Sequence, residues 1–234
     1  MVHSKMNKLG RLQLLYSQGR MVELKETICL TPEKKRTLEE KRLLAWALYR
    51  LKDYQGSFDL AVEINNIELI SQIISHITKD NDRLMKALEM CPDNPSVWNA
   101  YVIRAKDPDF KNFCMKKFFE KDDEFGESEE IGAINFRNNL ARLLLAKGTH
   151  YKDIWVALGL WNSVLIRYGK ENYPHRAEVC SRMQQAYSEI GEMNLAKEMA
   201  RQSAELWEIQ SKRYPQNLEF QKKYENALKI YQGL

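Results

Sequence analysis

Hydrophobic residues recur along this chain at the three- to four-residue spacing of an amphipathic α-helix, and short breaks separate the periodic stretches. The first stretch covers residues 10–17 and ends at Gln18-Gly19, and a second stretch over residues 21–28 follows at once. Glycine readily adopts the left-handed backbone conformation that ends many helices. The pattern therefore predicts two helices joined by a tight turn.

The next part of the chain predicts a second hairpin of the same kind. Thr31 can cap a helix and Pro32 fits its first turn, so we expect a helix to begin there and to run to Leu51. Lys52 and Asp53 form the second turn, and an apolar stretch follows them. The first and second turns are 33 residues apart, so the two hairpins form a candidate repeat.

The middle of the chain departs from this regular spacing. Residues 66–74 are largely apolar and predict a buried helix. Pro92 is expected to end one helix, and Pro95 is expected to begin another. Residues 121–130 are mostly acidic and predict an exposed linker before the next helix.

The C-terminal part of the chain contains two further predicted hairpins and a final helix. Their turns fall at Gly148 and Gly191, which are 43 residues apart. Tyr187 is expected to lie between paired helices, and the small side chain of Ala196 is expected to allow them to cross closely. Residues 215–234 form an amphipathic helix that we expect to cover the last apolar face.

These hairpins resemble those of the tetratricopeptide repeat family. The resemblance lies in the 33-residue step, in the junction Ala87-Leu88 to Pro92 and Trp98, and in the C-terminal Gly191 hairpin. It implies an all-α fold, namely a right-handed α-α superhelix (solenoid) of about five to six hairpins with a C-terminal capping helix. The expected division is residues 1–124 and 125–234, unless the two parts form one continuous solenoid.

Composition agrees with a folded helical protein and narrows the choice of partner. Of the 234 residues, 44% are hydrophobic and 29% are charged, with only 10 Gly and 6 Pro, too few to punctuate many short strands. The 36 basic and 32 acidic residues are interspersed, whereas nucleic-acid binders usually carry a clustered basic surface. The four cysteines form no CxxC pair, and no apolar stretch is typical of a signal peptide or a membrane span. We therefore expect a cytoplasmic protein.

Catalytic and metal-binding motifs are missing from the sequence. It contains no Walker-type loop and no GxGxxG, GxSxG or HExxH motif. The four histidines are isolated, and no carboxylate pair stands in an apolar setting that would raise its pKa. We therefore expect no enzyme activity, no cofactor and no metal ion.

The tetratricopeptide resemblance also implies a binding groove lined by one face of each first helix. The side chains expected on that face are Arg42, Trp46, Tyr49, Asn138, Arg142, Arg182 and Gln185. An Asn side chain can hold a partner's backbone through its donor and its acceptor, and Arg142 with Arg182 can clamp a carboxylate. The alternative is that these are ordinary solvated helix residues, and that most tryptophans are core residues rather than parts of a ligand cage. The C-terminal region, residues 134–210, is the first place to look for a bound partner.

The function expected from the sequence is a non-catalytic protein-interaction scaffold or adaptor that binds a peptide or a helix of a partner protein in a concave groove. The alternative is a nucleic-acid-binding or regulatory helical-repeat protein, since such repeats can bind RNA and the net charge is +4. A helical enzyme would need a deep pocket with converging carboxylates or histidines. Self-association through exposed helix surfaces is a further possibility.

Overall fold

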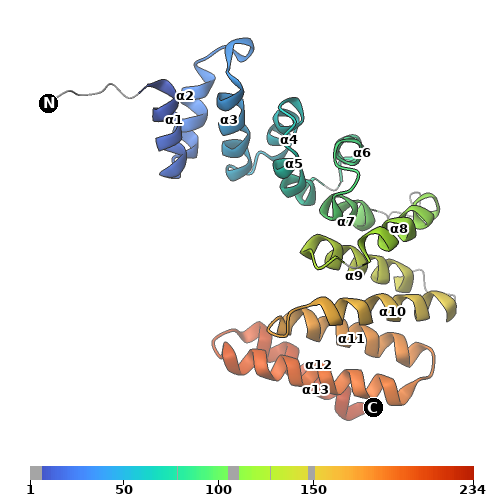
Figure 1. Cartoon of the computed structure of the whole chain (residues 1–234). Coiled ribbons are helices and arrows are strands. Elements are labelled where there is room, and N and C mark those ends of the chain that lie inside the picture. The colour runs from blue at the N-terminus through green and yellow to red at the C-terminus, as the bar shows by residue number, and fades with distance from the viewer. Residues whose placement is uncertain (1–6, 78, 105–110, 127, 147–150) are drawn as a thin grey trace. The chain divides into compact units, whose positions relative to one another are not determined.

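The computed structural model describes residues 7–77, 79–104, 111–126, 128–146 and 151–234. Within these ranges every regular element is a helix, and no strand occurs (Figure 1). The chain divides into two compact units, Met1–Arg104 and Ala105–Leu234, and each is described by itself. The division falls before the boundary at residue 124 that the sequence suggested, so the helix over residues 111–125 belongs to the second unit.

The first unit contains seven α-helices and two short 3₁₀ turns within its described residues. They are α1 (Lys8–Ser17), α2 (Met21–Cys29), η1 (Glu33–Lys35), α3 (Leu38–Arg50), α4 (Tyr54–Glu63), α5 (Ile67–Ile73), η2 (Ile74–His76), α6 (Asn81–Met90) and α7 (Pro95–Arg104). Helices adjacent in sequence pack against one another, most extensively α3 against α4 and α2 against α3. The predicted helices on both sides of Gly19 and of Lys52 are confirmed.

The second unit is built from longer helices. They are α8 (Lys111–Phe125), α9 (Ile131–Ala146), α10 (Tyr151–Arg167), α11 (Tyr173–Glu189), α12 (Met193–Arg213) and α13 (Leu218–Gly233). The most extensive contacts join α9 to α10, α11 to α12, and α12 to α13. The predicted turn at Gly148 lies outside the described residues, whereas the helices before and after it are confirmed.

Four hairpin turns share one backbone conformation with a residue at positive φ. These residues are Gly19 (φ 72°), Lys52 (φ 64°), Asn65 (φ 52°) and Gly191 (φ 79°). In each turn the N–H of the following residue donates to a carbonyl five residues earlier, as from Arg20 to Leu15, which is the Schellman arrangement. The positions Gly19 and Lys52 carry the 33-residue step, so the spacing read from the sequence corresponds to the same turn made twice.

Helix α3 begins later than the sequence predicted. Pro32 precedes the 3₁₀ turn η1, and Thr37 instead caps α3 by accepting a hydrogen bond from the N–H of Glu40 at 3.2 Å. The Glu40 carboxylate accepts from the N–H of Thr37 at 2.8 Å, which completes a capping box. This reciprocal pair satisfies two unpaired helix-end donors, whereas Thr31 and Pro32 offer only one cap, so the start predicted at Thr31 was wrong.

The predicted buried helix in the middle of the chain is confirmed. It consists of α5 and η2, whose side chains Leu69, Ile70, Ile73 and Ile74 are fully buried. The expected end and start near Pro92 and Pro95 are also present, since α6 ends at Met90 and α7 begins at Pro95.

Residues 121–125 are helical, so the prediction of an exposed linker over residues 121–130 was wrong for its first half. Helix α8 continues through Phe125 because Arg137 on α9 engages its last turn. The Arg137 guanidinium donates to Asp122 Oδ1 at 2.6 Å, to the carbonyl of Gly126 at 2.8 Å and to Ser163 Oγ on α10 at 2.6 Å. Arg137 is 7% exposed, so this arginine network joins α8, α9 and α10 in the interior of the unit.

Helices α11 and α12 cross closely, as the small residues of the Gly191 hairpin predicted. Ala196, Ala200 and Ser203 are buried, and Ser203 Oγ donates to the carbonyl of Ala177 at 2.9 Å. Helix α13 then packs Ala227 against Trp207 of α12.

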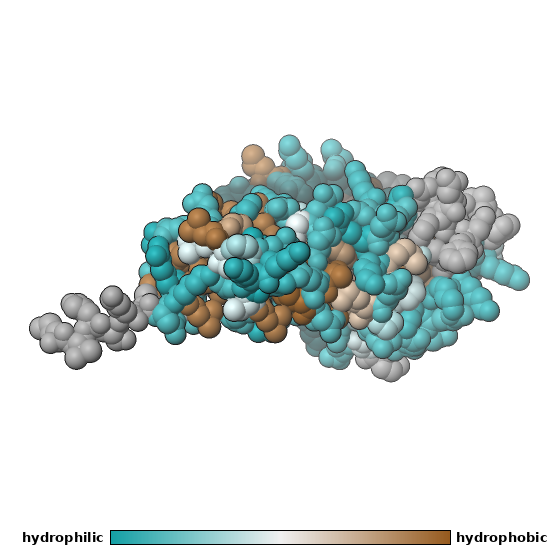
Figure 2. Space-filling model, turned by 90° about the horizontal axis from the view of Figure 1, so that it is seen from above, coloured by the Kyte–Doolittle hydropathy of each residue, from teal (hydrophilic) through white to brown (hydrophobic). Residues whose placement is uncertain are grey.

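The surface of the protein is mixed. Figure 2 shows hydrophilic side chains over most of the visible face, with hydrophobic ones in small groups among them. None of the described helices combines the length and the hydropathy that crossing a bilayer requires.

Candidate functional site

The second unit carries an open pocket of about 500 Å³ between α9, α10 and α11. Its lining residues are Arg142, Leu143, Leu145, Ala146, Trp161, Arg182 and Gln185. The 3.6-residue period of a helix places Arg142 one turn beyond Asn138 and places Gln185 next to Arg182 on one face of α11. The pocket therefore has an aliphatic and aromatic floor with two guanidinium groups and one amide at its edge.

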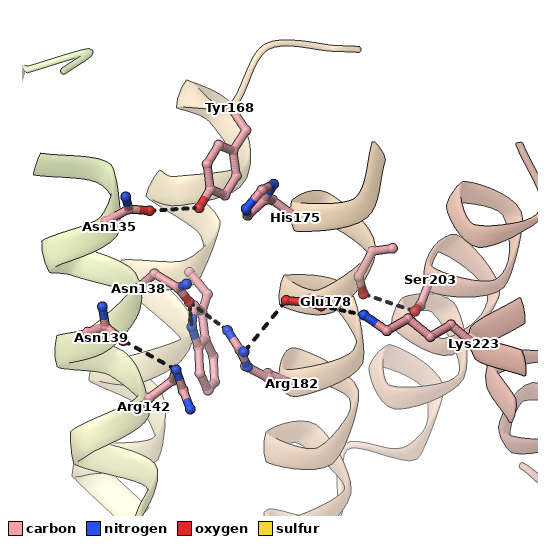
Figure 3. A network of polar contacts seen from close by, with 12 residues as sticks. Asn135, Asn138, Asn139, Arg142, Tyr168, His175, Glu178, Arg182, Ser203 and Lys223 are labelled. Atoms are coloured by element: carbon pink, nitrogen blue, oxygen red, sulfur yellow. Dashed lines mark hydrogen bonds and ion pairs between the residues drawn. The ribbon is translucent and has the colours of Figure 1, made fainter. Parts of the chain in front are cut away.

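The Asn138 side chain fixes the position of two pocket residues (Figure 3). Its Oδ1 accepts a hydrogen bond from Trp161 Nε1 at 3.1 Å and another from Arg182 Nη1 at 2.9 Å. Trp161 is fully buried, so its indole ring is held in one orientation by packing and by this bond. Arg182 is thereby positioned before any ligand arrives, which reduces the entropy lost on binding.

Two positive charges approach each other in this pocket. Burial, and secondarily the nearby Arg142, lower the pKa of Arg182 from its ordinary value, which indicates an environment unfavourable to the cation. The nearest carboxylate, Glu178, lies 3.9 Å from Arg182 on the same helix. Arg142 donates to Asn139 Oδ1 at 3.3 Å and makes no ion pair within the described part of the chain. An anion bound here would be stabilised by both guanidinium groups.

A second pocket of about 340 Å³ continues from the first along α11 to α13. Its lining residues are Glu178, Ser181, Arg182, Gln185, Ser203, Trp207, Lys223, Asn226, Ala227 and Ile230. Lys223 Nζ lies 3.0 Å from Glu178 (Figure 3). It also lies 4.7 Å from the centre of the Trp207 ring. Arg182 and Gln185 line both pockets, so the two form one groove across α9, α11 and α13, called the α9–α11–α13 groove below.

Four of the seven residues predicted for a binding face meet in this groove or beside it. Arg142, Arg182 and Gln185 line it, and Asn138 supports it from below. The side-chain amide of Gln185 is exposed and makes no hydrogen bond to another described residue, so it can pair with a ligand backbone. The Asn138 oxygen already accepts two internal hydrogen bonds, so its observed role is to position Arg182.

The other three predicted residues lie on α3 in the first unit. Arg42 forms an ion pair with Glu39 at 3.2 Å on its own helix. Trp46 contacts Tyr49 edge to face with ring centroids 5.9 Å apart. His76 stacks on Tyr54 at 4.1 Å and also lies beside Tyr49, so Trp46 and Tyr49 belong to an aromatic cluster of the first unit.

Several residues of the groove were not expected there from the sequence, and three of them make polar contacts in it: Trp161, Glu178 and Lys223. The last helix was expected only to cover the end of the helical array, so Lys223 on α13 was not expected in a binding site. The spacing of the predicted turns in the sequence was a signal for these contacts. The ion pair between Lys223 and Glu178 spans 45 residues, and the hydrogen bond between Arg182 and Asn138 spans 44. Both separations are close to the 43-residue step between Gly148 and Gly191, so equivalent positions of successive helices come together.

The described residues contain no group of three or more His, Cys, Asp or Glu side chains arranged to hold a metal ion. Burial raises the pKa of Cys180 to about 11, so its thiol is a poor nucleophile.

Comparison with known proteins gives a limited structural similarity. No protein-family model matches the chain, and no curated protein matches it. Among solved structures, a monomeric mutant of IFIT1 determined with m7Gppp-AAAA aligns with 97% of this chain at 14% sequence identity and a TM-score of 0.49. The alignment covers 58% of that chain, so this protein spans less than two thirds of its length. At this identity and TM-score, the match assigns no ligand to the protein.

Proposed function

We propose that this protein is a non-catalytic interaction module that binds an acidic, extended segment of a partner protein in the α9–α11–α13 groove. The observation that carries the proposal is the convergence of Arg142 and Arg182 on an open pocket, where Arg142 lacks an ion-pair partner among the described residues. Two guanidinium groups so placed favour a carboxylate, which each can hold through paired N–H donors.

The remainder of the groove suits a peptide chain. Leu145 and Ala146, which are not buried, offer an apolar surface next to the arginines, and Gln185 offers both a donor and an acceptor to a peptide backbone. An acidic side chain followed by an apolar one would meet both kinds of surface. This combination provides charge selection and apolar burial at adjacent positions.

The proposal includes a tetratricopeptide-like solenoid as the architecture that presents the groove. Support comes from the repeated Schellman turns, the close crossing of α11 and α12 at small residues, and the contacts between helices about 44 residues apart. The number of hairpins, about five to six with α13 as the cap, remains part of this proposal.

A protein partner is favoured over a nucleic acid by the alternation of charge along the groove. Glu178 lies between Arg182 and Lys223 and forms ion pairs with both. A carboxylate in the middle of the groove would repel a phosphate backbone that ran along it. A single carboxylate ligand at Arg142 and Arg182 would avoid this repulsion.

The test is binding of the full chain to an array of short acidic, neutral and basic peptides, followed by titration of the best binder by fluorescence anisotropy. We expect the Arg142→Glu/Arg182→Glu double variant to weaken the acidic peptide by at least about tenfold. The control is Lys116→Glu/Lys170→Glu, which makes the same change in net charge at exposed lysines that do not line the groove.

Equal affinity of the two double variants for the acidic peptide would refute the site. The wild-type chain could instead bind a single-stranded oligonucleotide more tightly than every acidic peptide, and the groove variant could lose that binding. This result would refute the proposed class of ligand and support the nucleic-acid alternative.

A further inference from the structure

Glu178 on α11 is the one carboxylate among the described residues that line the α9–α11–α13 groove, whereas three of the lining residues are cations: Arg142, Arg182 and Lys223. The Glu178 carboxylate lies between two of these cations, 3.0 Å from Lys223 Nζ and 3.9 Å from Arg182 Nη2 (Figure 3). Its side chain is 42% exposed, so a ligand in the groove can reach it. Glu178 therefore occupies a position that would otherwise be open to an anionic group of a ligand.

The two cations beside Glu178 have other partners, so the fold does not depend on this carboxylate. Lys223 Nζ also lies 3.4 Å from Glu219, one turn away on its own helix. Arg182 is held by Asn138 at 2.9 Å, whereas its separation of 3.9 Å from Glu178 exceeds hydrogen-bond distance. Ion pairs between such solvent-accessible side chains contribute little to stability. The Glu178 charge thus acts on the electrostatics of the groove more than on the stability of the unit.

The two ends of this charged row differ in what they offer to a ligand. At Arg182, burial and then the charge of Arg142 outweigh the charge of Glu178, so the pKa of Arg182 stays below its ordinary value. A ligand carboxylate between the two arginines would supply the missing negative charge. A second ligand carboxylate placed towards Lys223 would instead meet Glu178, which carries the same charge.

We infer that Glu178 restricts the groove to ligands with a single acidic side chain at the paired arginines, because it fills the neighbouring anion position between Arg182 and Lys223. This inference rests on the proposed function and assigns the specificity of the same site. An unfavourable contact with one ligand sets specificity as effectively as a favourable contact with another. Glu178→Gln removes the charge and keeps the shape of the side chain, so it opens the second position to an acidic group.

The spacing of the two anion positions matches that of alternate residues in an extended peptide. Glu178 and Arg182 are separated by four residues on α11, which is about 6 Å along the helix axis. Side chains at positions i and i+2 of an extended segment lie on the same face, about 6.5–7 Å apart. A second acidic residue two positions from the first is therefore the probe that tests the position occupied by Glu178.

The experiment compares three peptides on the full chain by fluorescence anisotropy. They are the best single-acid peptide and two derivatives that carry a second Glu two residues before or two residues after the first acid. With the wild-type chain we expect neither derivative to bind more tightly than the single-acid peptide. With Glu178→Gln we expect one derivative to bind at least about tenfold more tightly than the single-acid peptide. Peptides with Gln in place of the second Glu should show no such gain.

Glu219→Gln is the matched control variant. It makes the same change in net charge and removes the other carboxylate beside Lys223, but Glu219 does not line the groove. We expect it to keep the peptide preference of the wild-type chain. Circular dichroism of the Glu178→Gln and Glu219→Gln chains should show that both retain the fold.

An unchanged peptide preference in Glu178→Gln would overturn the inference. The same gain in Glu219→Gln would also overturn it, since net charge alone would then account for the change. In either case, single-acid binding that is lost in Arg142→Glu/Arg182→Glu would leave the proposed function standing. Failure of every acidic peptide to bind the wild-type chain would overturn the proposed function, and the inference with it.

Discussion

The four residues at positive φ occupy equivalent turns but differ in how easily they adopt that conformation. Gly19 and Gly191 have no Cβ and adopt it without steric cost, and Asn65 is a side chain that tolerates it. Lys52 places a Cβ close to its following carbonyl oxygen, which costs roughly 1–2 kcal/mol. The same backbone turn is therefore strained at one position and relaxed at two others.

For these single residues we predict opposite effects of two substitutions on the free energy of unfolding. Lys52→Gly should raise it by about 0.5–1 kcal/mol, because relief of the strained φ exceeds the entropy that glycine adds to the unfolded chain. Gly191→Ala should lower it by about 1 kcal/mol for the converse reason. Urea unfolding followed by circular dichroism measures both changes.

Asn65→Gly is the matched control for these two variants. It should change the free energy of unfolding less than Lys52→Gly does, since Asn already tolerates positive φ. Destabilisation by Lys52→Gly as large as that by Gly191→Ala would show that the turn conformation does not set the energetics.

Individual helices are held in place by a few buried polar contacts. The Arg137 guanidinium on α9 reaches the end of α8 and the body of α10, and Arg167 also donates to Ser163 Oγ at 2.7 Å. In the first unit, Glu40 receives contacts from Thr37 and from Lys8 on α1. Arg137 and Glu40 are charged side chains removed from water, so their hydrogen-bond and ion-pair partners determine whether their burial is tolerated.

Removal of the arginine should leave Asp122 as a partly buried unpaired charge. We predict that Arg137→Met lowers the free energy of unfolding by about 3–5 kcal/mol, and that adding Asp122→Asn restores part of this loss. Chemical denaturation of the single and double variants gives the coupling energy. Additive effects of the two substitutions would argue against a direct pair.

The Glu40 contacts also predict a dependence of stability on pH. The hydrogen bond from Lys8, followed by that from the Thr37 N–H, holds the pKa of Glu40 below its ordinary value of 4.5. An acid with a lowered folded-state pKa stabilises the fold above its unfolded-state pKa, and the contribution is lost as the pH falls through the folded-state pKa. The stability difference between wild type and Glu40→Gln should therefore be constant near neutral pH and shrink below pH 4.5. A difference that stays constant from neutral to acidic pH would contradict the assignment.

In the molecule as a whole, the candidate binding residues are distributed over both units. Every residue that lines the α9–α11–α13 groove belongs to Ala105–Leu234, whereas Arg42, Trp46 and Tyr49 belong to Met1–Arg104. The sequence resemblance placed all seven expected residues on one face, because it treated every hairpin as equivalent.

The division predicts that the second unit is sufficient for peptide binding. A fragment of residues 105–234 with native-like circular dichroism should bind the acidic peptide within about twofold of the affinity of the full chain. Anisotropy titrations of both proteins measure this ratio. A folded fragment that lost the peptide would show that the groove is incomplete within this unit.

The local sequence was sufficient to predict most helices and the turns at Gly19, Lys52 and Gly191. The reason is that helix formation and Schellman turns depend on residues within about five positions of one another. The resemblance to tetratricopeptide hairpins placed Arg142, Arg182 and Gln185 among seven residues of an expected face, and these three line one pocket. The start of α3 and the helical end of α8 depended on particular partners, Glu40 for Thr37 and Arg137 for Asp122. Only the folded chain distinguished Arg137, which is buried in an internal network, from Arg142 and Arg182, which face a groove. The physical reason is that this difference arises from contacts between residues up to 45 positions apart, including Lys223 with Glu178, and the periodicity of a single helix carries no information about them.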